Sequence, residues 1–89
     1  MKHLNIQVKG LVQGVFFRKN TKIQADKNQI KGWVRNEPDG SVYVEAEGTE
    51  DALKVFLDWL HEGPRHSEVS GVVINEGSIV HFNDFQIRY

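Results

Sequence analysis

The stretch IKGWVRNEPDGSVYVEAEGTEDALKVFLDWLHEGP, residues 30–64, carries the clearest structural signals in this 89-residue sequence. Residues 30–36 are rich in apolar and β-branched side chains, which favours a strand. The turn sequence Glu37-Pro38-Asp39-Gly40 follows, in which proline presets φ and Asp-Gly tolerates positive φ. Residues 42–47 then alternate apolar and polar side chains, as a half-buried strand does. We therefore expect a β-hairpin.

The end of the same stretch predicts an amphipathic helix. Thr49 is a suitable N-cap, and the acidic residues after it suit the positive end of the helix dipole. The apolar residues recur at i, i+3, i+4 and i+7, which places them on one face. They are Leu53, Phe56, Leu57 and Leu60. Gly63-Pro64 predicts the end of the helix.

The rest of the chain extends this pattern in both directions. Alternating residues 4–8 predict a first strand, and residues 10–17, with two glycines, predict a loop. A helix is expected from about residue 18 to 28, with a weak apolar stripe formed by Phe17, Thr21 and Ala25. Residues 69–74 predict a fourth strand, and Phe85, Ile87 and Tyr89 a last one at the C-terminus.

The resulting order is β-α-β-β-α-β with room for an additional C-terminal strand. It predicts an α+β fold, the ferredoxin-like sandwich, in which an antiparallel sheet has two helices packed on one face. The length suits a single domain over residues 1–89. Because this fold hosts many functions, the function has to be inferred from a site.

Composition excludes several classes of function. The chain has no cysteine, which favours a reducing compartment and excludes a thiolate nucleophile. Residues 1–8 alternate polar and apolar side chains, so we predict neither a signal peptide nor a membrane span, and a cytoplasmic location. The net charge of −1 argues against nucleic-acid binding. We expect a monomer.

The loop from Gly10 to Arg18 is the first candidate site. A glycine-bearing loop between a strand and a helix can turn several backbone N–H groups toward one point and bind an anion. Arg18 falls in the first turn of the helix, where a cation opposes the dipole, and a bound phosphate would resolve that conflict. The alternative is a solvated arginine behind an ordinary loop, which is the commoner situation.

Asn36, at the end of the second strand, is the second candidate. An asparagine before a turn usually bonds its own backbone, and taken alone this is the favoured interpretation. The functional alternative is an amide that holds a water molecule through both its donor and its acceptor atoms.

Together these stretches resemble the acylphosphatase family. The family's first signature, G-x-V-Q-G-V-x-F-R, is matched from Gly10 to Arg18. The second, G-W/x-V-x-N-x-x-D/x-G, is matched from Gly32 to Gly40. The closing residues 84–89 are also similar to the family, so the resemblance covers essentially the whole chain in one register.

The resemblance implies an enzyme without metal or cofactor that hydrolyses the carboxyl–phosphate anhydride of small acyl phosphates. Asn36 would position the attacking water, and a phosphate oxygen of the substrate could take the proton. Arg18 would be oriented by the C-terminal carboxylate of Tyr89. The phosphoryl group would be held by Arg18 and by the backbone amides of Gln13, Gly14, Val15, Phe16 and Phe17.

One position departs from the family pattern, and several other residues have simpler interpretations. Glu37 stands where the family often has a small hydroxyl residue, and Ser41 across the turn is a candidate to replace it. Glu45 and Glu47 are expected to be solvated. The four histidines, which are His3, His61, His66 and His81, show no metal-ligand spacing and are expected at the surface. Of Phe16 and Phe17, one is expected in the core.

Two other classes of function share this order of elements. An RNA-recognition or small-molecule regulatory domain is one, but the charge balance disfavours RNA, and a regulatory domain needs no arginine in an anion loop. The other is an acylphosphatase-like fragment of a larger carbamoyl-transfer protein.

Overall fold

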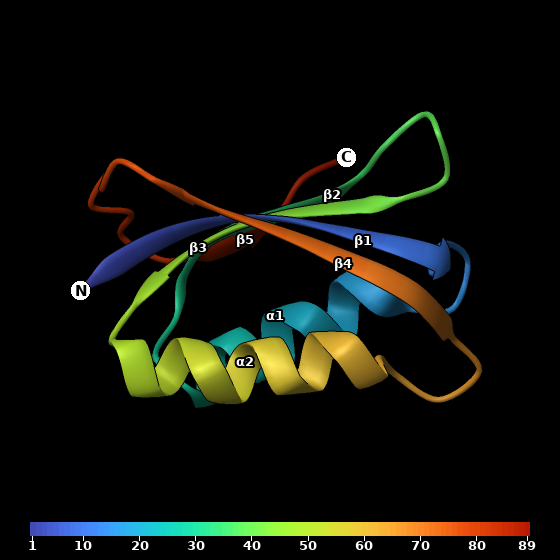
Figure 1. Cartoon of the computed structure of the whole chain (residues 1–89), viewed down its shortest axis with the longest axis horizontal. Coiled ribbons are helices and arrows are strands. Elements are labelled where there is room, and N and C mark those ends of the chain that lie inside the picture. Colours follow the sequence, from blue (N-terminus) through green and yellow to red (C-terminus); the bar gives the residue numbers. More distant parts are fainter.

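The computed structural model describes all 89 residues as one twisted sheet with two helices on one of its faces (Figure 1). The sheet has five strands in the order β4-β1-β3-β2-β5. Along the chain the elements are β1 (Lys2–Leu11), α1 (Phe17–Lys27), β2 (Lys31–Asn36), β3 (Val42–Gly48), α2 (Glu50–Glu62), β4 (Glu68–Gly77) and β5 (Phe85–Ile87). The α+β sandwich and the β2–β3 hairpin predicted from the sequence are confirmed.

The first four strands are antiparallel, but β5 is not. It pairs with β2 in parallel, Gly32 opposite Phe85 and Val34 opposite Ile87. The reason is the connection over residues 78–84, which leaves the end of β4 on one edge and crosses to the other edge. A strand that starts there must run opposite to β4 and hence alongside β2. The expected wholly antiparallel sheet is therefore corrected at its last strand.

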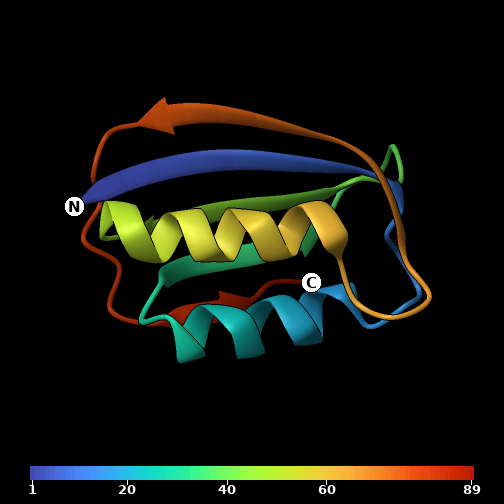
Figure 2. The same ribbon diagram turned by 60° about the horizontal axis from the view of Figure 1, so that its bottom comes forward.

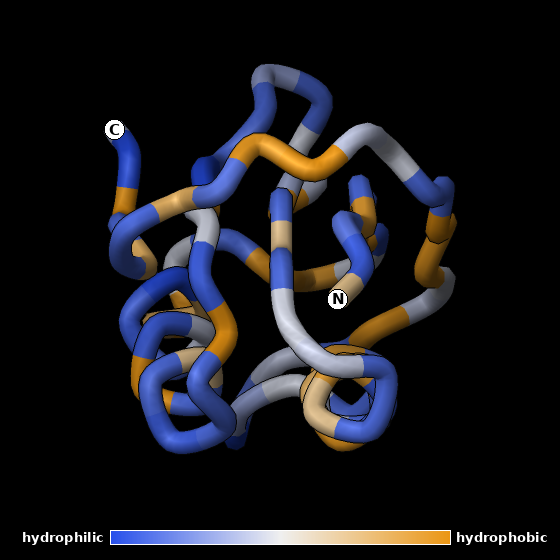
Figure 3. The backbone as a smooth tube through the Cα atoms, turned by 90° about the vertical axis from the view of Figure 1, so that its left-hand side faces the viewer, coloured by the Kyte–Doolittle hydropathy of each residue, from blue (hydrophilic) through white to orange (hydrophobic).

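Both helices place the predicted faces on the sheet. Helix α1 buries Phe17, Thr21 and Ala25. Helix α2 buries its apolar stripe and is capped by the Thr49 hydroxyl, which accepts a hydrogen bond from the Ala52 N–H at 3.2 Å. Figure 3 shows polar and apolar segments alternating along both helices, as expected for elements with one face on a core.

The core lies between the helices and the sheet as one cluster of 15 buried apolar residues. Phe56 of α2 meets Phe85 of β5 edge-on, with ring centroids 6.2 Å apart. Because the core of such a small domain is thin, truncating one of these rings to alanine is expected to cost about 3–5 kcal/mol of stability.

The other face of the sheet departs from the sequence prediction at one end. His3 and Glu47 were expected at the surface, but both are buried. The Glu47 carboxylate accepts hydrogen bonds from His3 Nδ1 at 2.8 Å, from the Val80 N–H, and from the Phe82 N–H at 3.0 Å. The 78–84 connection covers this end of the sheet, so the alternation that predicted a solvated face was misleading there.

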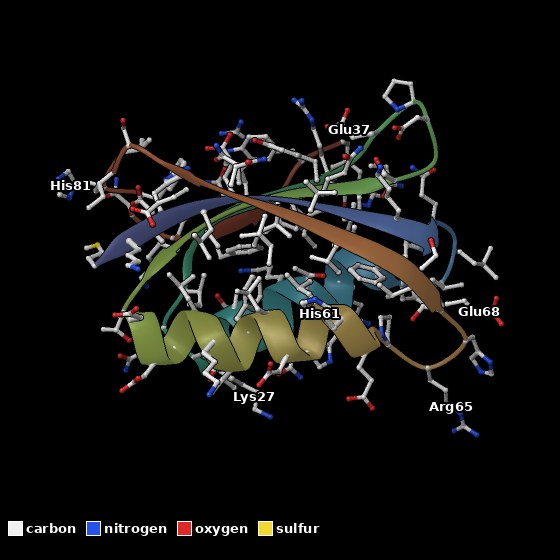
Figure 4. The ribbon with its side chains drawn as sticks, viewed as in Figure 1. Lys27, Glu37, His61, Arg65, Glu68 and His81 are labelled. Atoms are coloured by element: carbon white, nitrogen blue, oxygen red, sulfur yellow. The ribbon has the colours of Figure 1, made fainter.

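These contacts set the charges of the pair. Burial raises the pKa of the Glu47 carboxyl, but hydrogen bonds from Val80, His3 and Phe82 outweigh it and lower that pKa to about 2. Burial lowers the pKa of His3, but its bonds to Glu47 and Asn5 raise it above the ordinary value. The other three histidines are exposed, as predicted, and His81 lies at the edge of the molecule in the connection after β4 (Figure 4). No helix is long and apolar enough to cross a membrane.

Candidate active site

Two glycines and a phenylalanine shape the end of β1 and the loop before α1; Gly10, which the sequence placed in the loop, lies in β1 and pairs with β4. A bulge interrupts the β1–β4 pairing between Lys9 and Gly10. A Cβ at Gly10 would overlap the carbonyl oxygen of Glu68. Gly14 has φ of 74° and Phe16 has φ of 58°, so both take left-handed conformations, and Phe16 stands at the N-cap of α1. These turns fold residues 12–16 around the start of the helix.

This loop leaves a run of backbone N–H groups without acceptors. None of the amides of residues 13–19 donates a hydrogen bond within the protein. The first N–H groups of any helix have no partner inside it, and they carry its positive partial charge. Here no side chain caps them, and no acidic residue lies in the first turn of α1. The geometry therefore offers donors and positive potential at one place.

Arg18 lies in the first turn of α1 and reaches the C-terminal segment. Its Nη1 donates to the carbonyl oxygen of Arg88 at 3.2 Å, and its guanidinium carbon lies 4.6 Å from the ring centre of Tyr89. Figure 2 shows the C-terminal end of the chain beside the first turn of α1. The segment after β5 thus positions the guanidinium through a carbonyl and a ring. The expected orientation by the Tyr89 carboxylate stays a prediction.

Asn36 ends β2 on the same face as the buried Val34, because side chains of a strand alternate between faces. Its side chain therefore lies on the helix side of the sheet. The neighbouring turn is tied to the loop by Gln13, whose Nε2 donates to the carbonyl oxygens of Glu37 at 2.8 Å and Ser41 at 2.9 Å. Asn36 is thus held close to the loop.

One pocket of about 550 Å³ brings these parts together. It is lined by Val12, Gly14, Phe16, Phe17, Arg18, Lys19, Asn36, Ile87 and Tyr89. Of the predicted phosphate-binding residues, Gln13 and Val15 are absent from this lining. The side chains of two cations, Arg18 and Lys19, line the pocket and no Asp or Glu does, so its side-chain charge suits an anion.

Sequence reasoning missed three wall residues, Val12, Lys19 and Ile87. Val12 and Ile87 lie inside stretches that matched the family and carried no separate chemical signal. Lys19 follows Arg18 directly, and its charge in the first turn of α1 was the available clue. Phe17 proves to be the core member of the phenylalanine pair, with 2% exposed, and Phe16 is the exposed one.

Glu37 does not disturb this pocket. Its carboxylate accepts a hydrogen bond from Arg35 Nε at 2.9 Å. Figure 4 shows Glu37 above the sheet, on the side away from the helices. Ser41 also turns elsewhere, because its hydroxyl donates to Asp39 at 2.6 Å. The hydrogen bonds from the Ser41 hydroxyl and backbone N–H lower the pKa of the Asp39 carboxyl.

Comparison with known proteins identifies the family. A family model described as Acylphosphatase matches residues 4–87. An acylphosphatase of Thermotoga maritima is 44% identical over 89 residues, which cover 100% of this chain and 99% of the relative. The chain belongs to the acylphosphatase family.

Other acylphosphatases agree with this assignment. One from Pseudomonas aeruginosa is 45% identical over 85 residues, covering 96% of this chain and 93% of the relative. The crystal structure of acylphosphatase from Bacillus subtilis matches with a TM-score of 0.97 and 39% identity, covering 100% of both chains. The chain is therefore an acyl phosphate hydrolase, and the binding-module alternative is set aside. No group of three or more His, Cys, Asp and Glu side chains in this acylphosphatase is arranged to hold a metal.

Proposed function

We propose that Arg18 and the amides of residues 13–17 hold the phosphoryl group of an acyl phosphate, and that Asn36 positions the water that attacks it. The observation that carries this proposal is the shared pocket: Arg18, Asn36 and the start of α1 line one cavity that has no Asp or Glu side chain in its lining. If the Asn36 side chain only bonded its own turn, we would not expect it to line that cavity.

Electrostatics favour a phosphate in this pocket. The N–H groups of residues 13–19 donate no hydrogen bond within the protein, and like the guanidinium of Arg18 they can donate to a bound anion. Without an anion, Arg18 and Lys19 oppose the dipole of α1, and a phosphoryl group reverses that penalty. The planar guanidinium donates to Arg88 through Nη1 and has further N–H groups to give to phosphate oxygens.

The reaction needs positioning more than proton transfer. The water oxygen forms a bond to phosphorus, and the bond from phosphorus to the acyl oxygen breaks, its electron pair leaving with the carboxylate. A phosphate oxygen takes the proton, and the products are a carboxylate and inorganic phosphate. Because a carboxylate is a good leaving group, no acid or base of the protein is required, and no Asp, Glu or His side chain lines the pocket.

Three further expectations belong to this proposal. The reaction needs no metal, because the N–H groups and Arg18 supply the charge that a metal would provide. A monomer is the default expectation for a polar chain of 89 residues. The cytoplasmic location remains the prediction of its cysteine-free composition.

The deciding experiment follows benzoyl phosphate hydrolysis with a chelator present. The enzymes compared are wild type, Arg18→Ala, Arg18→Lys and Asn36→Ala. Arg65→Ala is the matched control, because Arg65 is exposed in the α2–β4 connection and points to solvent (Figure 4). We expect chelator-resistant turnover in wild type and control, and losses of at least about 10²-fold in the other three.

The contrary results are distinct. Near-normal turnover in Arg18→Ala would remove the arginine from its role, and the same result in Asn36→Ala would remove the asparagine. Activity abolished by the chelator would show that a metal takes part. As a second readout, inorganic phosphate should raise the melting temperature of wild type but not of Arg18→Ala, which tests binding without turnover.

A further inference from the structure

Phe16 breaks two local rules at once. It is an aromatic residue with 76% of its surface exposed, and it holds a left-handed backbone conformation with φ of 58° and ψ of 29°. Bulky side chains rarely adopt that conformation, and asparagine or glycine would be easier to accommodate. Strained and exposed apolar residues of this kind gather at functional sites.

The ring of Phe16 forms no aromatic pair within the protein and is largely exposed. The neighbouring Phe17 packs on Trp59 with ring centroids 5.7 Å apart, whereas Phe16 takes part in none of the aromatic pairs of the molecule. It lines the same pocket as Arg18. Its exposed apolar surface is therefore available to a molecule bound there.

The C-terminal side of the pocket is also apolar. Tyr89 is 99% exposed and presents one ring face to the Arg18 guanidinium at 4.6 Å. Ile87 adds a half-buried aliphatic side chain to the lining. Five of the nine lining residues are hydrophobic. The pocket thus combines a cationic part at the start of α1 with exposed aromatic surface on Phe16 and Tyr89.

An acyl phosphate has the same division, with a doubly charged phosphoryl end and an uncharged acyl end. We infer that Phe16, with Tyr89, forms a subsite for the acyl group and makes the enzyme prefer acyl phosphates with an aromatic or large apolar acyl group over those with a small one. The inference rests on the proposed function, because the phosphoryl end has to be held by Arg18 for the acyl end to reach these rings.

The preference has a simple physical source. An acyl ring placed against Phe16 removes apolar surface of both groups from water, and paired aromatic rings gain further from their edge and face charges. An acetyl group is too small to gain as much. Because the ring contacts the acyl end and not the reacting phosphorus, it should act mainly through KM rather than kcat.

The test compares kcat/KM for benzoyl phosphate with kcat/KM for acetyl phosphate in the whole chain. The variants are Phe16→Ala, which removes the ring, and Phe16→Tyr, which keeps it. Ile23→Ala is the matched control, because Ile23 is an exposed apolar residue of α1 outside the pocket. The benzoyl-to-acetyl ratio serves as the readout, because it cancels any general change at the phosphate loop.

We expect wild type to favour benzoyl phosphate and Phe16→Ala to lower the ratio about tenfold, mainly through KM for benzoyl phosphate. Phe16→Tyr and Ile23→Ala should keep the wild-type ratio within about twofold, since both retain the ring at residue 16. A Phe16→Ala ratio equal to that of wild type, or an equal fall in Ile23→Ala, would overturn the subsite. A wild type that hydrolyses neither substrate would instead contradict the proposed function.

Discussion

The side-chain amide nitrogen of Gln13 lies 2.8 Å from the carbonyl oxygen of Glu37, the residue that follows Asn36. The same nitrogen donates to the carbonyl oxygen of Ser41 at 2.9 Å, so one side chain joins the β1–α1 loop to both ends of the β2–β3 turn. In the sequence Gln13 was expected to contribute only its backbone amide. Its side chain sets the distance between the two parts of the site.

Removing this link should affect activity more than stability. In Gln13→Ala the carbonyls of Glu37 and Ser41 each lose one donor but keep a backbone N–H, so we expect the free energy of unfolding to fall by only about 1 kcal/mol. The turn that carries Asn36 would then shift, and kcat/KM should fall about 10–100-fold. Gln86→Ala is the control, because Gln86 is exposed and its amide bonds only Asp84, at 3.3 Å. Unchanged kcat/KM in Gln13→Ala would show that the turn keeps its place without the link.

Two glycines of the loop should respond differently to alanine. At Gly14 a Cβ would meet nothing within 4 Å, so Gly14→Ala carries only the strain of its φ of 74°, about 1–2 kcal/mol. At Gly10 a Cβ would overlap the Glu68 backbone, so β1 and β4 would have to separate and the loss should be larger. Urea unfolding of both variants measures the difference. An equal loss in the two would mean that the close approach at Gly10 relaxes easily.

Deleting Tyr89 should lower enzyme activity more than stability, as is expected for Gln13→Ala. The side chain is 99% exposed, so we expect the free energy of unfolding to change by less than about 0.5 kcal/mol. Arg18 would lose the ring 4.6 Å away, and any orientation by the Tyr89 carboxylate, so kcat/KM should fall. Thermal unfolding and steady-state kinetics on the same preparation test this. Full activity after deletion would leave the Arg88 carbonyl as sufficient support for Arg18.

The buried Glu47 should make stability depend on acid pH. Its pKa is lowered to about 2 in the folded protein, so its contribution is complete above the pKa of the unfolded chain and is lost as the pH falls from about 5 toward 2. The loss over that range should be about 3 kcal/mol in wild type and much smaller in Glu47→Gln. Urea unfolding at a series of pH values measures both slopes. Parallel slopes would assign the acid loss to other carboxylates.

His3 should make stability depend on pH in the opposite direction to Glu47. Its pKa is raised by its bonds to Glu47 and Asn5, so its contribution is complete below the pKa of the unfolded histidine and fades as the pH rises through the higher folded value. The same pH series therefore should show greatest stability between the two transitions. His61→Ala is the control for the loss of a histidine that is not buried, because His61 is exposed on α2.

The sequence predicted the parts of the fold that depend on local periodicity and turn chemistry. The Thr49 cap, the apolar face of α2 and the turn before Ser41 were all visible in it. The i, i+4, i+8 spacing of Phe17, Thr21 and Ala25 also suffices to put Phe17 in the core, since Phe16 falls outside that stripe.

The features that the sequence did not predict depend on contacts between segments that are distant in the chain. The parallel placement of β5 and the burial of His3 and Glu47 both arise from the path of residues 78–84, for which no periodic pattern exists. The bonds of the Gln13 side chain depend on the hairpin meeting the loop. Arg18 and Asn36 were candidates from their local sequence patterns, the family resemblance implied their roles, and the structure adds that they line one pocket.

The pairing of β1 with β4 sets His3 opposite Gly77, residues near the two ends of the chain. Contacts of such long sequence separation make refolding slow, because the loop has to close before they form. The pocket draws on the loop after β1, the start of α1, the end of β2 and the chain from Ile87 onward, so no early fragment of the chain can contain it. We expect turnover to return only with the final cooperative step of refolding. The time course of recovered enzyme activity would then report when the sheet is complete.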